Sequence, residues 1–258
     1  MLRSMYTAGT AMLTYTRKMD VITNNMTNAE TRGYKMDTLA TRSFRDMLID
    51  RLADPSFFVH ERVGPHNTGI HVDQNYTTFT QGPLEETAVP TDFALLGDGF
   101  FVIDYTDEED EETVERYTRN GAFNVDVEGM LVTGDGHYVL GEGGPVYVGG
   151  MDFTVTQDGF VFDAEGNEID KLRVVVFEDN SALRKTGDNM FYNFDPENNE
   201  PEDITGAMKQ GYLENSNVDT AREMVNMMQT YRAYEINQRV LRMIDESLGR
   251  AVNDIARV

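Results

Sequence analysis

The chain has 258 residues and carries a net charge of −23. Because it contains no cysteine, disulfides and thiolate metal sites are excluded. The length suffices for one large or two small domains, and a hydrophobic content of 40% is enough to form a folded core. Such an acidic chain lacks the basic face that phosphate binding needs, so we expect no nucleic-acid partner.

The negative charge lies in the middle of the chain. Residues 51–217 hold 9 basic and 34 acidic side chains, whereas residues 1–50 carry a net charge of +2 and residues 218–258 carry zero. Two interpretations stay open: a well-solvated surface, or ends that pack together while the middle faces water. No stretch approaches the roughly 20 apolar residues of a membrane span, so we expect neither membrane insertion nor a removable signal peptide.

The N-terminal segment predicts an amphipathic helix. Apolar or small residues recur in steps of three or four from Leu2 to Met26. Polar residues near Asn28 compete for backbone hydrogen bonds and predict the end of the helix there, and Gly33 favours a turn. An apolar stripe at the very end of a chain has little intramolecular cover, which favours an assembly element over a domain core.

Residues 36–80 predict a linker. Phe44, Met47, Leu48 and Leu52 favour a short helix, and the proline and glycine residues that follow predict loops or short extended pieces.

Residues 81–216 predict a β-rich domain. Residues 92–103 form two apolar runs around Gly97-Asp98-Gly99, and Asn120-Gly121 is a strong hairpin signal. Further turn signals lie at residues 126–129, 134–136, 158–159 and 165–167, in two pairs whose members are about 7 residues apart. This spacing predicts an antiparallel sandwich or barrel rather than βαβ units.

Residues 217–258 predict a second long helix. Thr220 to Glu223 fits a capping box, with Asn217 and Asp219 as competing caps. Its apolar stripe averages close to 3.5 residues per step, although Glu235 and Gln238 interrupt it, which is typical of a coiled-coil seam. The helix would extend roughly 58 Å, longer than a compact domain of this size needs.

The expected fold class is therefore α+β. Long N- and C-terminal helices, residues 1–35 plus 217–258, pack as a coiled coil that forms an assembly domain. Residues 36–80 link it to a central antiparallel β-rich outer domain, residues 81–216.

Three blocks of the sequence resemble the axial proteins of the bacterial flagellum, the rod and hook proteins of the basal body. The stretch "MDVITNNMTNAETRGYK" (19–35) is similar to their N-terminal signature, and "LENSNVDTAREMVNMMQTYRAYEINQRVL" (213–241) to their C-terminal one. The stretches "TFTQGPLEETAVPTDFALLGDGFFVI" and "YTRNGAFNVDVEGMLVTGDGHYVLG" also fit between them. The chain departs from the pattern at Arg32, where proline often sits, and in the acidic run at residues 107–112.

The resemblance implies a structural protein of the flagellar basal body that is exported through the flagellar type III apparatus. The terminal helices would form the inner coiled-coil layer of a helical tube that transmits torque, with the β domain facing outward. Its implied partners are copies of itself, other rod or hook proteins and the export apparatus. The length favours a rod subunit, because hook proteins usually carry inserted domains; a hook subunit is the alternative.

The periodicity and the two signatures together give a set of expected assembly residues. They are Leu2, Met5, Met12, Met19, Ile22, Asn24, Asn25, Gly33, Tyr34, Met224, Met228, Tyr231, Leu241, Ile244 and Leu248.

We expect no enzymatic activity, no catalytic residues, no cofactor and no metal. The histidines at 60, 66, 71 and 137 lack the helical spacing of a zinc site, and the all-acidic run at residues 107–112 lacks the alternate spacing and turn glycine of a calcium loop. The stretch at residues 163–170 is better explained by a β-turn than by a calcium loop.

Two other functions stay open on the residues alone. One is a β domain whose helical hairpin recruits a single partner. The other is a hydrolase of cell-wall glycan, which rests only on abundant carboxylates.

Overall fold

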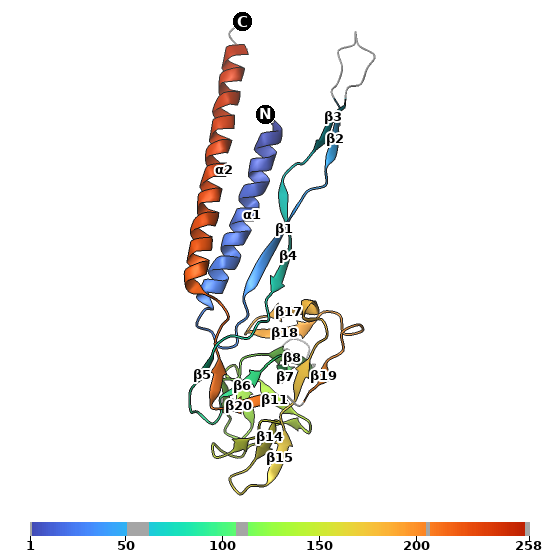
Figure 1. Cartoon of the computed structure of the whole chain (residues 1–258), viewed down its shortest axis with the longest axis vertical. Helices are drawn as coiled ribbons and strands as arrows, with labels where there is room; N and C mark the ends of the chain where they lie inside the picture. Colours follow the sequence, from blue (N-terminus) through green and yellow to red (C-terminus); the bar gives the residue numbers. More distant parts are fainter. Residues whose placement is uncertain (1, 51–61, 107–112, 205–206, 256–258) are drawn as a thin grey trace. The chain divides into compact units, whose positions relative to one another are not determined.

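The computed structural model describes residues 2–50, 62–106, 113–204 and 207–255 and has the predicted α+β composition (Figure 1). The chain divides into two compact units, which we call the helical unit (Met1–Thr27, Asp37–Tyr76 and Asp219–Val258) and the β unit (Asn28–Met36 and Thr77–Val218). The expected boundaries differ from this division in two places. Residues 28–36 group with the β unit, and residues 37–76, expected as a linker, group with the helical unit.

Two long antiparallel helices lie side by side in the helical unit (Figure 1). Helix α1 spans Leu2–Thr27 and α2 spans Thr220–Ile255. At 1.5 Å per residue they are about 39 and 54 Å long. Among the candidate caps, Asp219 is the one that caps α2: its Oδ1 accepts hydrogen bonds from the backbone N–H groups of Ala221 and Arg222.

The rest of the helical unit is a β ribbon. Strand β1 (Asp37–Ser43) pairs with β4 (Ile70–Thr77), and β2 (Met47–Asp50) pairs antiparallel with β3 (Arg62–His66). Strand β1 contacts α1, and the Thr14 hydroxyl donates to the Ile70 carbonyl.

The predicted short helix at residues 44–52 is therefore wrong. Met47 pairs with His66 and Leu48 with Pro65 in the ribbon, and Leu52 lies outside the described residues. Four apolar side chains over nine residues indicated a short helix, which is marginal on its own, whereas the partner strand satisfies the backbone of Met47–Asp50.

A large antiparallel sheet forms the centre of the β unit. Its main path runs β17-β18-β8-β7-β11-β10-β9, with β12, β16 and β19 attached, and smaller sheets pair β13-β14-β15, β20-β6 and β21-β5. The bounds are β5 Leu84–Glu86, β6 Phe93–Leu96, β7 Phe100–Thr106, β8 Thr113–Thr118, β9 Phe123–Val125, β10 Leu131–Thr133, β11 Tyr138–Gly141, β12 Gly144–Pro145, β13 Thr154–Val155, β14 Phe160–Phe162, β15 Glu168–Lys171, β16 Val174–Val176, β17 Leu183–Thr186, β18 Met190–Asn193, β19 Glu202–Asp203, β20 Ala207–Gln210 and β21 Tyr212–Glu214, with a short 3₁₀ helix at Asn180–Ala182.

Strand β7 buries side chains on both faces of this sheet. Phe101 and Ile103 belong to the larger apolar cluster, and Phe100 and Val102 belong to a second cluster. Because successive strand residues point to opposite faces, the continuous apolar run of β7 matches a strand with cores on both sides.

Four of the predicted turns are confirmed as hairpins. The β9-β10, β10-β11, β13-β14 and β14-β15 pairs are all antiparallel neighbours. Their turn glycines, Gly129, Gly136, Gly159 and Gly166, have φ between 84° and 90°. These values lie in the left-handed region that glycine occupies without a steric penalty.

The hairpin predicted at Asn120-Gly121 is wrong. Strand β8 pairs with β7 and β18, whereas β9 pairs with β10, so the two residues connect strands that are not paired with each other. Gly121 is required here by close approach, because a Cβ at this position would lie 1.8 Å from the Phe93 carbonyl oxygen.

Candidate assembly interface and polar clasp

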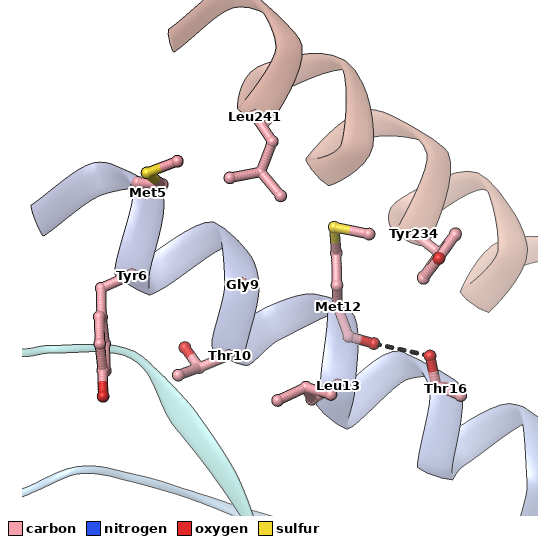
Figure 2. A pocket seen from close by; sticks show the side chains of 9 residues that line it. All are labelled: Met5, Tyr6, Gly9, Thr10, Met12, Leu13, Thr16, Tyr234 and Leu241. Atoms are coloured by element: carbon pink, nitrogen blue, oxygen red, sulfur yellow. Dashed lines mark hydrogen bonds between the residues drawn. The ribbon is translucent and has the colours of Figure 1, made fainter. Parts of the chain in front are cut away.

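The helical unit contains an open apolar groove along α1 and α2. It has a volume of about 790 Å³. Figure 2 shows Met5 and Met12 of α1 pointing toward Leu241 of α2, while Tyr6 and Leu13 lie on the side of α1 that is turned away from α2. We call this the α1–α2 groove, lined by Met5, Tyr6, Gly9, Thr10, Met12, Leu13, Thr16, Tyr234 and Leu241.

The groove is apolar and only partly filled by the chain itself. Tyr6 is 69% exposed and Leu13 is 71% exposed. Gly9 leaves a gap in its wall, because a Cβ added there would meet no heavy atom within 4 Å. Large apolar side chains clustered at one exposed site indicate an interaction surface.

A second apolar surface lies on α2. We call it the outer stripe, and it consists of Met224, Val225, Met228, Tyr231, Ile236 and Met243, all exposed. At 100° per residue, Val225 lies about 160° around the helix from Leu241, which lines the groove. Helix α2 is thus apolar on two sides, and one side is without cover within the described residues.

The expected assembly residues occupy three kinds of position. Met5 and Met12 line the groove together with Leu241, whereas Met224, Met228 and Tyr231 belong to the outer stripe. Ile22 is buried, and Met19, Ile244 and Leu248 are half-buried. The side chain of Leu2 lies outside the described residues.

The paired asparagines of the N-terminal signature have separate environments. Asn24 is exposed. Asn25 is buried, its Nδ2 donates to the Asp37 carbonyl, and its Oδ1 accepts from the Asp37 N–H. This two-way hydrogen bond joins the end of α1 to the first residue of β1, so Asn25 fixes local chain geometry.

Gly33 and Tyr34 lie in the β unit rather than on the helices. Gly33 has φ of 67°, and a Cβ there would lie 2.5 Å from backbone atoms of Arg119 and Asn120. Tyr34 is buried, with the Lys185 ammonium 4.0 Å from the centre of its ring. The signature turn is therefore packed against the chain segment that follows β8.

A buried cluster of charges lies beside this turn. The Lys35 ammonium donates to Glu214 Oε1 at 2.5 Å and to the Thr80 carbonyl at 2.9 Å. Arg119 donates to Glu214 Oε2 at 3.4 Å, and the Gly82 N–H donates to Oε1 at 2.8 Å. We call Lys35, Arg119 and Glu214 the polar clasp; each is at most 2% exposed.

The clasp joins segments that are far apart in sequence. The Glu214 carbonyl also accepts from the Gly33 N–H, and the Asn217 side chain binds the Met36 N–H and the Thr78 carbonyl. The segment entering the β unit is thereby connected to the segment leaving it. Burial lowers the pKa of Lys35 and of Arg119, and Glu214 opposes the shift in both cases.

Sequence reasoning missed the clasp. Lys35 and Glu214 stand inside the two quoted signatures, and Arg119 stands in the middle block. A charged residue within each of three family blocks is the signal that could have identified them. Nothing in the sequence pairs residues that lie 179 and 95 positions apart.

Two further expectations concern metal binding and membrane insertion. Within the described residues, no group of three or more histidine or carboxylate side chains is arranged to hold a metal ion. In the same part of the chain, no helix is both long and apolar enough to cross a membrane. His60 and the acidic run at residues 107–112 lie outside the described residues. Residues 163–167 form the turn of the β14-β15 hairpin.

Three family descriptions match successive parts of the chain. Residues 5–35 match "Flagella basal body rod protein", residues 94–186 match the "Flagellar hook protein FlgE/F/G D1 domain", and residues 209–254 match "Flagellar basal body rod FlgEFG protein C-terminal". The first and third include most of α1 and α2, and the second lies wholly in the β unit.

Similar proteins align over nearly their whole length. The chain is 33% identical to the flagellar basal-body rod protein FlgG of Bacillus subtilis, with 98% of this chain and 99% of the relative covered. It is 30% identical to the flagellar hook-basal body complex protein FlhO of the same organism, with both chains covered completely. It is 32% identical to the rod protein FlgF of Caulobacter vibrioides, with 99% and 97% covered. With a helix at each end, a β unit between them and this agreement along the whole chain, the protein belongs to the family of flagellar basal-body rod proteins.

Proposed function

We propose that this axial structural subunit assembles, through its paired terminal helices, with copies of itself and with other rod or hook proteins into a helical tube that transmits torque. The observation that carries the proposal is the outer stripe. Six exposed apolar side chains follow one side of α2, while the opposite side already packs toward α1. A helix that is apolar on two sides needs a second partner to bury both.

The charge distribution supports the same arrangement. Residues 1–50 and 218–258 carry net charges of +2 and zero, whereas residues 51–217 carry −25. Copies that met through the acidic middle would repel one another, and copies that met through the helices would not. We therefore propose that the helices form an inner coiled-coil layer and that the β unit faces outward.

We further propose delivery through the flagellar type III export apparatus and a rod position rather than a hook position. The rod position is supported by relatives named as rod proteins that align end to end with this chain. Accumulation of the subunit inside cells that lack the export apparatus tests the delivery route.

The variant Met228→Asp tests the assembly proposal. Met228 is 53% exposed, so an aspartate there leaves the isolated chain folded, but it puts a charge into a contact repeated by every subunit. We expect wild-type protein to form filaments visible by electron microscopy and Met228→Asp to remain monomeric with unchanged helical circular dichroism.

Val127→Asp is the matched control. Val127 is a fully exposed apolar side chain in the β9-β10 turn, away from the helices in sequence, so it reports the general effect of one added carboxylate. Assembly is expected to survive this change. Filaments of normal length from Met228→Asp would contradict the proposal.

A further inference from the structure

The part of α1 that lines the groove and the first two turns of the outer stripe are both free of charged residues. Residues 5–16 and residues 224–231 contain no Asp, Glu, Lys or Arg, in a chain of which 26% is charged. Burying these two segments against each other would remove water from no charged side chain of either segment, so neither contributes a penalty for desolvating charge. The two surfaces are therefore compatible with each other in chemistry.

The two surfaces are also compatible in size. The groove's volume of about 790 Å³ lies within the range of roughly 300–1,000 Å³ in which protein pockets enclose a whole ligand. Several large side chains fit in such a space. The outer stripe presents Met228 and Tyr231 with neighbouring apolar residues, and methionine adapts its shape to irregular gaps.

One chain cannot fill its own groove with its own stripe. The groove is lined mainly by α1, with Tyr234 and Leu241 of α2 at its edge, whereas the outer stripe points to a different side of α2. Resting on the function proposed above, we propose that the outer stripe of one copy docks into the α1–α2 groove of the next copy. This contact joins two different surfaces, so each added copy leaves a free groove at one end and a free stripe at the other. Growth continues as an open helical filament when the rotation between copies does not close a ring.

The contact also fixes a stagger between neighbours. The groove lies at the level of Tyr234 and Leu241 on α2, and the uncharged part of the stripe spans Met224–Tyr231. The centres of these segments are about ten residues apart, which corresponds to about 15 Å along the helix. Neighbouring copies that point the same way are therefore displaced by about 15 Å along the helix axis.

Cysteine cross-linking tests this contact directly, because the natural chain contains no cysteine. Leu13→Cys places a thiol in the groove and Met228→Cys places one on the stripe, and both positions are exposed in the single chain. Under oxidising conditions, the double variant is expected to give a ladder of covalent multimers. A mixture of the two single variants is expected to give one dimer band, and each single variant alone none.

Thr16→Cys, also exposed in the groove, replaces Leu13→Cys if that variant lacks normal helical circular dichroism. The pair Val127→Cys with Met228→Cys controls for random collision and should give no ladder. Dimers from Leu13→Cys alone would show a closed, two-fold contact and overturn the inference. Filaments of wild-type protein without cross-links in the double variant would overturn this inference only, whereas the absence of filaments would contradict the proposed function.

Discussion

The Lys35 ammonium and the Glu214 carboxylate form an ion pair of 2.5 Å with both side chains buried. The pair joins the segment that enters the β unit to the segment that leaves it. Arg119 shares the same carboxylate, so two buried cations depend on one anion. A buried pair adds little stability over apolar packing, but the loss of one member leaves an uncompensated charge in the interior.

The clasp predicts an ordered pair of stability losses. Glu214→Leu leaves Lys35 and Arg119 buried without the carboxylate that neutralises them, and it should lower the free energy of unfolding by about 3–5 kcal/mol. Lys35→Met should cost less, because Glu214 keeps Arg119 and the Gly82 N–H as partners. Urea unfolding of the full chain measures both values. Equal losses, or a larger loss in Lys35→Met, would show that the carboxylate is not the centre of the cluster.

Glu85 should contribute to the loss of folding stability in acid. Hydrogen bonds from Arg32 and Asn215 hold the pKa of this carboxyl below its usual value of 4.5. Because the folded state binds the proton less tightly than the unfolded state, the stabilisation is complete above pH 4.5 and is lost as pH falls through the lower, folded-state pKa. Glu85→Gln should therefore show a smaller loss of stability than wild type between pH 5 and pH 3.

The Glu85 interaction is exposed, so salt provides its control. The difference in the pH dependence of stability between wild type and Glu85→Gln should shrink at about 1 M salt, where the Debye length falls to roughly 3 Å. A pH dependence identical in the two proteins at low salt would argue that Arg32 and Asn215 do not favour the ionised carboxylate.

Gly121 should tolerate no side chain. A Cβ there would lie 1.8 Å from the Phe93 carbonyl oxygen, so Gly121→Ala must move backbone in the core of the β unit. Overpacking of this kind typically lowers the free energy of unfolding by about 1–3 kcal/mol. Because the clash here is with backbone, we expect a loss of about 3 kcal/mol or more. Gly134→Ala is the matched control, since its Cβ would meet nothing within 4 Å. Similar melting temperatures for the two variants would contradict the packing described here.

Gly9 separates helix stability from assembly. Gly9→Ala should stabilise α1 by up to about 1 kcal/mol, because glycine is a poor helix former, and should leave assembly intact. Gly9→Leu should keep the helix equally well formed but fill the gap in the groove wall and prevent filament growth. Sedimentation of concentrated protein measures assembly. If Gly9→Leu pelleted as wild type does, the groove would not be a docking surface.

Local patterns predicted much of this fold. The helical periodicity of apolar residues predicted both helices, whose bounds lie within a few residues of those expected, and the glycine-containing turn signals predicted four hairpins. The failures depend on distant partners. Leu48 becomes a strand residue because Pro65 lies opposite it, and Gly121 is set by Phe93 rather than by a hairpin.

The candidate site was predictable only in part. The apolar residues of both surfaces follow from spacing, but spacing does not tell which side of α2 faces α1. Met228 and Leu241 were assigned to one seam, yet they lie about 140° apart around the helix. The clasp required three charged residues from three separate segments, and local sequence carries no information on which of them meet.

The central claim is that the outer stripe of α2 is buried only between copies. Methionine oxidation measured residue by residue by mass spectrometry tests it on one sample, before and after assembly. Met224 and Met228 should oxidise readily in the monomer and slowly in filaments, while Met151, 68% exposed in the β unit, provides the internal reference and should oxidise equally in both. If Met224 and Met228 oxidise as fast in filaments as in the monomer, the stripe is not the assembly surface.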